Sequence, residues 1–173
     1  MGFFEPERYF ARVSAINIQR DIVDKSYSHV LIDVDNTLLT RDDHTVPRDA
    51  LIWFGKLREA GVKICLLSNN FHIGVVHLAE KLEVPIVAKA IKPLPHGFLM
   101  ARGKIGGKRK NTVMIGDQLI TDVLGAHFLG MPAYLVCPLV EADLKHTLLL
   151  RNLERIVMGD AEPEGAASCE TLR

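Results

Sequence analysis

Cysteine is scarce in this chain and shows no useful pattern. The 173 residues include three cysteines, Cys65, Cys137 and Cys169. Their number is odd and their spacing wide, which excludes a disulfide framework or a zinc-binding cluster and predicts reduced thiols in a cytosol-like compartment. An excess of charge of either sign is also missing, since the formal net charge is zero. Nothing in the overall charge therefore favours nucleic acid or an anionic membrane as a partner.

Long apolar runs are missing as well. No segment approaches the roughly 20 apolar residues that cross a bilayer, and the N-terminus has no apolar stretch of the signal-peptide type. The hydrophobic content of 48% and charged content of 24% are typical of a soluble globular protein. We therefore expect a cytoplasmic protein with one domain, residues 1–158, and a disordered tail rich in Gly, Ala, Glu and Ser at 159–173.

Short apolar runs alternate with amphipathic helical patterns along the chain. Strands are expected at 29–33, 62–67, 85–88, 112–115 and 133–136, and helices at 47–60, 72–82, 94–104, 119–129 and 142–157. This alternation predicts an α/β fold, doubly wound, with a mainly parallel sheet of about five strands and helices on both faces. Such sheets bind ligands beyond the carboxyl ends of their strands.

Polar residues follow four of the expected strands. Asp33 and Asp35 end the first, Ser68 ends the second, Lys92 follows the third and Asp117 ends the fourth. Side chains alternate along a strand, so the first two carboxylates point the same way. Their mutual repulsion requires a nearby cation or a shared proton. The sequence thus predicts one acidic site at one edge of the sheet.

The same segments resemble the four motifs of the haloacid dehalogenase (HAD) superfamily, in order, and most closely those of the YqeG family of HAD subfamily IIIA phosphatases. The resemblance covers residues 3–157 and is carried by Asp33-Val34-Asp35-Asn36-Thr37, Ser68-Asn69-Asn70, Lys92-Pro93 and Gly116-Asp117-Gln118-Leu119-Ile120-Thr121-Asp122. Between the first and second motifs there is room for one helix and one strand, and the same is true between the second and third motifs. No cap domain, the substrate-selecting insertion of many relatives, is therefore expected.

The resemblance implies a phosphoric monoester hydrolase that forms an aspartyl phosphate. Asp33 would be the nucleophile, and Asp35 the general acid and then the general base. The expected Mg²⁺ ligands are the Asp33 and Asp117 carboxylates and the main-chain carbonyl of Asp35. Asp122 is either a further ligand or a brace for its loop. The phosphate would be held by Ser68, Asn69 and Lys92.

Other interpretations stay open from the residues alone. A single Asp-x-Asp is usually a solvated turn, and an acidic residue such as Asp122 often faces a helix dipole. A phospho-accepting module similar to a response-regulator receiver also combines acidic residues with Ser or Thr and Lys. Receivers, however, carry the accepting Asp on a later strand and need no residue equivalent to Asp35. His72, His77 and His127 have no metal-ligand spacing and are expected on half-buried or surface positions.

An uncapped site predicts a bulky phosphate ester, such as a lipid headgroup or a macromolecule, or a homodimer that covers the site. Relatives of the YqeG family act on phosphatidylglycerophosphate, which makes this lipid the specific expectation. The extension at residues 1–28 mixes aromatic residues with Arg8, Arg12 and Arg20. It is expected either to pack on the domain or to rest on a bilayer as a peripheral contact.

Overall fold

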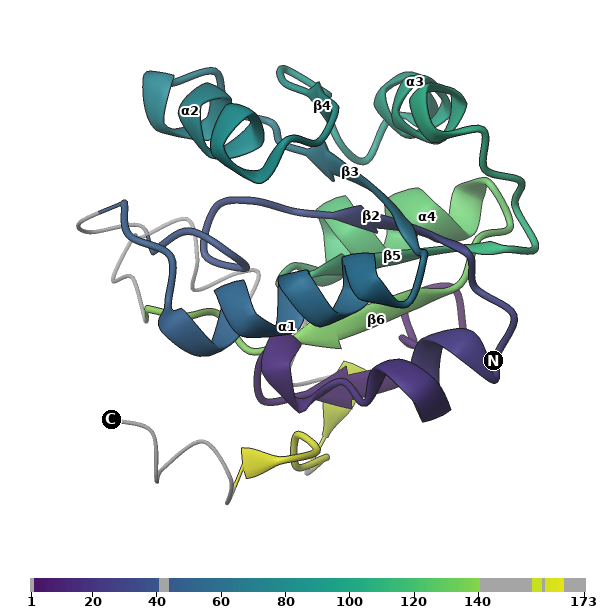
Figure 1. The fold of residues 1–173 in the computed structure, drawn as a ribbon. Helices are drawn as coiled ribbons and strands as arrows, with labels where there is room; N and C mark the ends of the chain where they lie inside the picture. The colour runs from purple at the N-terminus through teal and green to yellow at the C-terminus, as the bar shows by residue number, and fades with distance from the viewer. Residues whose placement is uncertain (1, 41–43, 141–156, 160, 167–173) are drawn as a thin grey trace.

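A single parallel sheet forms the centre of the protein, whose computed structural model describes residues 2–40, 44–140, 157–159 and 161–166. Every neighbouring pair of strands in it is parallel, in the spatial order β1-β6-β5-β2-β3-β4 (Figure 1). The strands are β1 (Arg8–Phe10), β2 (His29–Ile32), β3 (Lys63–Leu67), β4 (Ile86–Val87), β5 (Thr112–Gly116) and β6 (Ala133–Val136). The chain reverses its direction of winding between β2 and β5, where such sheets place their sites.

Helices connect these strands, as the alternating pattern predicts. They are α1 (Arg48–Glu59), α2 (Ile73–Leu82), α3 (Pro95–Ile105) and α4 (Gly125–Phe128), with a 3-10 turn η1 (Val13–Ala15) and two π-helical turns, η2 (Ile18–Val23) and η3 (Leu119–Leu124). The chain leaves α1 through Gly61, whose φ of +75° suits the absence of a side chain. The helix expected at 142–157 lies almost wholly outside the described residues.

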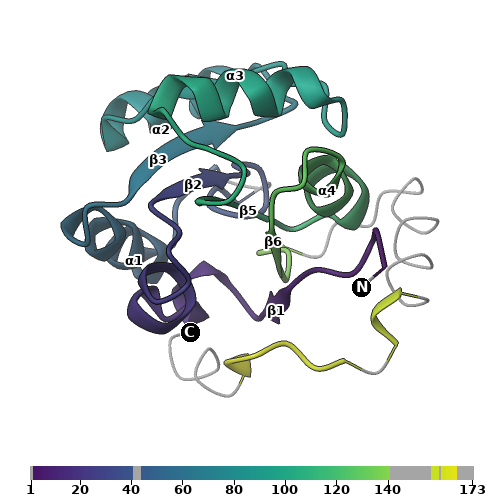
Figure 2. The ribbon, with the colours of Figure 1, turned by 90° about the vertical axis from the view of Figure 1, so that its right-hand side faces the viewer.

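The helices cover both faces of the sheet, as expected. On one face α1, α2 and the N-terminal turns pack on alternate residues of the strands, with Trp53, Phe54 and Leu57 among the buried side chains. On the other face α3, η3 and α4 bury a second apolar layer that includes Phe98 and Val123. Figure 2 shows α1 and α4 on opposite sides of the sheet. The α/β fold predicted from the sequence is confirmed.

The expected number of strands is corrected from about five to six, because the N-terminal extension contributes β1. This strand pairs with β6 at the edge of the sheet. Phe10, Val13 and Ile16 are at most 2% exposed, and the Trp53 indole donates to the Ile16 carbonyl at 2.9 Å. Of the two alternatives for this extension, packing on the domain is therefore the one that its described contacts favour.

The C-terminal segment also differs from the expected disordered tail where it is described. Glu164 forms a bridge beside Phe10, and its main chain exchanges hydrogen bonds with Tyr9 and Ala11 at 2.9 Å each. Its carboxylate also pairs with the Arg8 guanidinium. The composition of this segment could not predict that pairing, because a single residue that joins a sheet edge leaves no apolar periodicity in the sequence.

No cap domain is present among the described residues around the strand ends. Those between Asp35 and Ser68 form α1 and β3, and those between Ser68 and Lys92 form α2 and β4. Within the described part of the chain, no helix is long and apolar enough to cross a membrane.

Candidate active site

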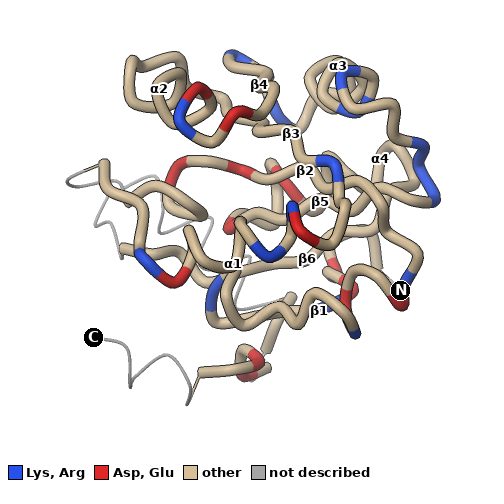
Figure 3. Tube along the Cα trace, in the orientation of Figure 1, with Lys and Arg blue, Asp and Glu red and all other residues tan. Residues whose placement is uncertain are grey.

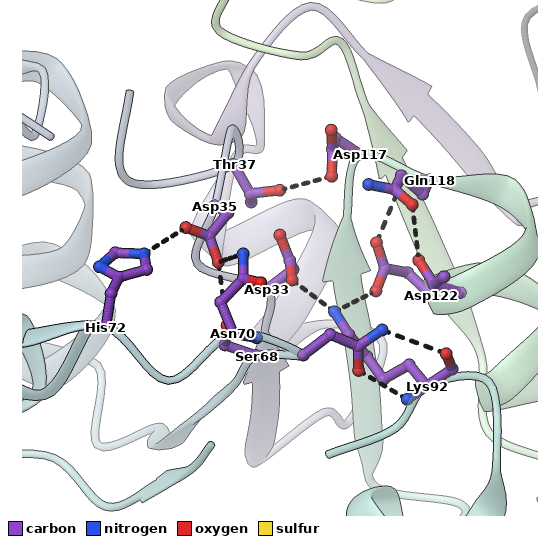
Figure 4. A network of polar contacts seen from close by, with 12 residues as sticks. Asp33, Asp35, Thr37, Ser68, Asn70, His72, Lys92, Asp117, Gln118 and Asp122 are labelled. Atoms are coloured by element: carbon purple, nitrogen blue, oxygen red, sulfur yellow. Dashed lines mark hydrogen bonds and ion pairs between the residues drawn. The ribbon is translucent and has the colours of Figure 1, made fainter. Parts of the chain in front are cut away.

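The carboxyl ends of the strands bring together side chains that are far apart in the sequence (Figure 4). Asp33 directly follows β2, Lys92 follows β4, Asp117 directly follows β5, and Asp122 lies on η3. All four are at most 8% exposed. The fold therefore brings these acidic and basic residues together at one edge of the sheet, as the sequence predicts.

The Lys92 ammonium joins the two sides of this cluster. It donates to Asp122 Oδ1 at 2.6 Å and forms a short ion pair with Asp33 Oδ1. Its main chain is held by the Asn69 side chain, which accepts from the Lys92 N–H at 2.6 Å and donates to the Lys92 carbonyl at 3.1 Å. Asn69, predicted to bind phosphate, thus positions the lysine loop in this structure.

Three carboxylates around one ammonium leave a buried excess of negative charge. Burial, followed by the neighbouring Asp122 and Asp35 charges, raises the pKa of Asp33 to about 7 although Lys92 opposes this. Burial and the charges of Asp33 and Asp122 likewise raise the pKa of Asp117 well above its ordinary value. Burial lowers the pKa of Lys92, but the two aspartates that it contacts outweigh burial and raise it. The ammonium is therefore charged, and the carboxylates are under-neutralised.

Asp122 is held against the end of β5. A Cβ at Gly116 would come within 2.2 Å of its carboxylate, so only glycine permits this approach. Its Oδ2 accepts the Gln118 N–H at 3.1 Å, while its Oδ1 accepts from Lys92. The side chain braces the loop, one of the two roles that the sequence left open, and places a carboxylate in the cluster, where the role of metal ligand stays a prediction.

Asp35 points to a second, more exposed network. Its Oδ2 accepts from Ser68 Oγ at 2.9 Å and from the Asn70 amide at 3.0 Å. Its Oδ1 lies 2.9 Å from His72 Nε2. Burial acts to raise the pKa of Asp35, but the hydrogen bonds from these three side chains outweigh it and lower the pKa below its ordinary value. The ionised carboxylate is thus favoured.

His72 is a contact of the site that the sequence prediction missed. It was expected at a half-buried or surface position without a role; it is half-buried, but it lies just before α2 and contacts Asp35. Metal-ligand spacing could not reveal His72, because a histidine that contacts one carboxylate needs no second histidine. The sequence sign for His72 was its position two residues after Asn70, in the loop that follows a strand. Ser68, predicted to bind phosphate, is 0% exposed and donates a hydrogen bond to Asp35.

The carboxylates at the end of the sheet fit a divalent metal ion. One ligand oxygen from each of Asp33, Asp117 and Asp122 lies within 4.8 Å of the other two. Carboxylate oxygens are the ligands that Mg²⁺ prefers, and buried negative charge in excess of the ammonium favours a cation there. The Thr37 hydroxyl donates to Asp117 Oδ1 at 3.4 Å, which orients that side chain. With a divalent ion bound, this arrangement could neutralise and orient a phosphate group beside the Asp33 carboxylate.

Two comparisons with known sequences found similar proteins. A family model described as a haloacid dehalogenase-like hydrolase matches residues 42–130, a range that contains Ser68, Lys92, Asp117 and Asp122 but begins after Asp33 and Asp35. A protein of Bacillus subtilis (strain 168) named "Probable phosphatase YqeG" is 31% identical over 163 residues, which cover 94% of this chain and 94% of the relative.

Solved structures share the fold. An uncharacterised protein of Listeria monocytogenes serotype 4b superposes with a TM-score of 0.53 at 21% identity, over 72% of this chain and 99% of that one. A cobalt-bound deoxy-D-mannose-octulosonate 8-phosphate phosphatase of Haemophilus influenzae gives a TM-score of 0.54 at 13% identity, over 78% of this chain and 88% of that one. At these identities the similarity supports the fold alone.

Proposed function

The chain belongs to the haloacid dehalogenase-like hydrolase family and, within it, to the YqeG family of phosphatases, and we propose that it hydrolyses phosphate monoesters through a covalent intermediate on Asp33. The observation that carries this proposal is the cluster of three buried carboxylates around Lys92, with Asp35 two residues beyond the nucleophile. The wild-type reaction would consume water and release an alcohol and inorganic phosphate.

In the first step an Asp33 carboxylate oxygen attacks phosphorus while the bond to the leaving oxygen breaks. The leaving oxygen takes a proton from Asp35, and the product is an acyl phosphate on Asp33. In the second step Asp35 accepts a proton from water, the water oxygen attacks phosphorus, and the bond to Asp33 breaks. The buried Lys92 ammonium balances charge on the transferred group throughout.

The hydrogen bonds at Asp35 bear on these two steps differently. Ser68, Asn70 and His72 favour its ionised form, which is the form needed to accept a proton from water. The first step needs the protonated form, and a phosphate dianion brought beside Asp35 raises its pKa in that direction. These hydrogen bonds also fix the direction in which the carboxylate points.

A divalent ion, proposed to be Mg²⁺, would supply positive charge for the phosphate oxygens and for the crowded carboxylates. Asp33 and Asp117 would hold it through their side chains and Asp35 through its main-chain carbonyl. Asp122 lies close enough to take part, and its hydrogen bonds to Lys92 and Gln118 keep it in place.

The proposed substrate is a bulky phosphate ester, with phosphatidylglycerophosphate as the first choice. Two lines support this: the resemblance to the YqeG family and the absence of a cap among the described residues around the strand ends. We also propose a cytoplasmic location, which the free cysteines Cys65 and Cys137 favour.

The test is a Mg²⁺-dependent turnover assay that compares phosphatidylglycerophosphate, sugar phosphates, nucleotides, phosphopeptides and p-nitrophenyl phosphate. We expect repeated turnover with Mg²⁺, none with a chelator, and the highest kcat/KM for the lipid. A receiver-like module would take up phosphate once, in an amount equal to the protein, and release none. That stoichiometry would contradict the proposed hydrolase, whereas a preference for another ester would change only the substrate.

A further inference from the structure

A second histidine lies beside the candidate site, outside the network described above. His44 is in the loop between β2 and α1, and its ring centre is 4.9 Å from that of His72, with the two ring planes 34° apart. His44 is exposed, whereas the side chains of His72 and Asp35 are 33% and 13% exposed. The three side chains therefore lie in a row that leads from solvent to the proposed general acid.

The inner contact of this row is a single hydrogen bond. His72 Nε2 donates to Asp35 Oδ1 at 2.9 Å, since an ionised carboxylate has no proton to donate. Among the described residues, no lysine or arginine lies within ion-pair distance of Asp35. The charged positions of α2, Glu80 and Lys81, are at the end of the helix remote from His72 (Figure 3). The direction of Oδ1 thus depends on how firmly the His72 ring is held.

Two features hold the His72 ring. The first turn of α2 approaches it closely, because a Cβ at Gly74 would come within 3.1 Å of its Nδ1. His44 lies against the ring at a separation typical of attractive aromatic pairs. A single hydrogen bond leaves an imidazole free to turn, so these two contacts restrict what the bond to Asp35 alone does not.

The loop that carries His44 has a defined conformation at its base. The Thr40 N–H donates to the Thr45 carbonyl and the Thr45 N–H to Thr40 Oγ1, each at 2.9 Å. His44 has a φ of +54°, in the left-handed region that histidine enters more often than most residues. Such conformations persist where the surrounding structure requires them, and they cluster at functional sites. Here the conformation accompanies the contact with His72.

We propose that His44 is a positioning residue, which acts through His72 to fix the direction of the Asp35 carboxylate. A general acid must lie within hydrogen-bond reach of the leaving oxygen, so a small change in its direction lowers the rate. This inference rests on the proposed function, because it names a further residue for the same reaction.

His44→Asn removes the ring but keeps a residue that adopts the left-handed region. The steps reported by kcat/KM end when the leaving group departs, and in them Asp35 gives its proton. We expect kcat/KM to fall about fivefold for glycerol phosphate, whose alkoxide needs that proton, and less than about twofold for p-nitrophenyl phosphate, whose phenolate leaves without it. Loss of folded protein would lower both values equally.

Two further variants serve as rescue and control. His44→Phe keeps an aromatic ring against His72, so kcat/KM for glycerol phosphate should return to within about twofold of the wild type. His77→Ala, at an exposed position on α2, should leave both substrates unchanged.

A double-mutant cycle tests whether His44 acts through His72. His72→Ala should lower kcat/KM for glycerol phosphate about tenfold, and the addition of His44→Asn should cause no further loss. Two independent effects would instead multiply to about 50-fold.

Nuclear magnetic resonance of the metal-free protein with ¹⁵N-labelled histidine tests the geometry without turnover. The His72 Nε2 proton, held by Asp35, should give a signal protected from exchange with water. His72→Ala assigns this signal by removing it. We expect the signal to broaden or vanish in His44→Asn and to return in His44→Phe.

Three outcomes would overturn the positioning role: an unchanged or equally lowered kcat/KM for the two esters in His44→Asn, a multiplied loss in the double variant, or an unchanged His72 signal in His44→Asn. The proposed function fails in a different way. If the wild type turned over none of the esters, the hydrolase would be contradicted, while the His72 signal of the same samples would still decide whether His44 holds His72.

Discussion

Two buried aspartates in this protein have opposite surroundings. Asp21, on η2, is 0% exposed and accepts hydrogen bonds from the Arg20 guanidinium at 2.6 and 3.0 Å and from the Asn17 N–H at 2.8 Å. It also pairs with Arg8, which contacts Glu164 in turn. Burial raises the pKa of Asp21, but these partners outweigh it and the pKa is lowered. Asp33 is 6% exposed, and its pKa is raised to about 7.

The difference lies in the balance of charge. Around Asp21 two guanidinium groups meet two carboxylates, and the ion pairs hold the N-terminal segment on the sheet edge. Around Asp33 one ammonium meets three carboxylates. Removing one partner from the first arrangement would leave an uncompensated buried charge, whereas the second carries uncompensated charge until a cation arrives. Such under-neutralised burial is typical of functional sites rather than of structural ion pairs.

The largest effect is expected from Asp33→Asn. Removal of the nucleophile should reduce turnover of p-nitrophenyl phosphate by at least about 10³-fold. The metal-free variant should also unfold at an equal or higher temperature than the wild type, because one of three crowded charges is gone. Steady-state kinetics and thermal denaturation measure both. Full activity in this variant would contradict the nucleophile assignment.

Asp21→Asn should act in the opposite way. Two guanidinium groups lose their shared charge, so the free energy of unfolding should fall by about 3 kcal/mol, the lower end for a broken buried ion pair since Arg20 reaches solvent. Turnover per folded molecule should stay unchanged. Urea denaturation measures the loss, with exposed Asp24→Asn as the control that changes stability by less than about 0.5 kcal/mol. Equal stability of the two variants would refute the contrast.

His72→Ala tests the more exposed network at Asp35. Loss of the hydrogen bond to Oδ1 should lower kcat about tenfold with little change in KM. His72→Gln should restore much of the rate, because the glutamine amide can donate to the same oxygen. The exposed His77, on α2, provides the control substitution to alanine. A rate unchanged in the alanine variant would remove His72 from the site.

The smallest effect concerns His127, which contacts Glu7 and the Phe3 carbonyl at the opposite edge of the sheet. The hydrogen bond to Glu7 is the main cause that raises the pKa of His127 above 6.5. The stabilisation is therefore complete below pH 6.5 and is lost as the pH rises through the higher folded-state value. His127→Gln should remove a pH-dependent contribution below about 1 kcal/mol. If the thermal midpoint of His127→Gln changed with pH in the same way as that of the wild type, the assignment of this pH-dependent stabilisation to His127 would be contradicted.

The fold and the main cluster could be predicted because both depend on strong local signals. Five strands are short apolar runs, and Asp33, Lys92 and Asp117 each follow one of them, so the strand-end rule locates them without coordinates. β1 could not be found in this way, because Arg8–Phe10 is three residues long and one of them is charged. Its place depends on pairing with β6, more than a hundred residues away.

The sequence was less informative on how polar side chains share the site. Ser68 and Asn69 stand at the expected strand end, but the sequence does not say that the first bonds to Asp35 and the second to the Lys92 main chain. His72 required the path of the loop between β3 and α2. These are tertiary contacts between loops, which residue types and spacing do not determine.

Calorimetric titration of Mg²⁺ into the metal-free protein tests the central claim, that the unbalanced carboxylates at the sheet edge form a cation site. The wild type should bind one ion, and Mg²⁺ at a hundred times its Kd should raise the free energy of unfolding by about 2.7 kcal/mol. Asp21→Asn should bind equally, and Asp117→Asn should bind at least about tenfold more weakly. Equal binding by Asp117→Asn, or no binding by the wild type, would contradict the claim.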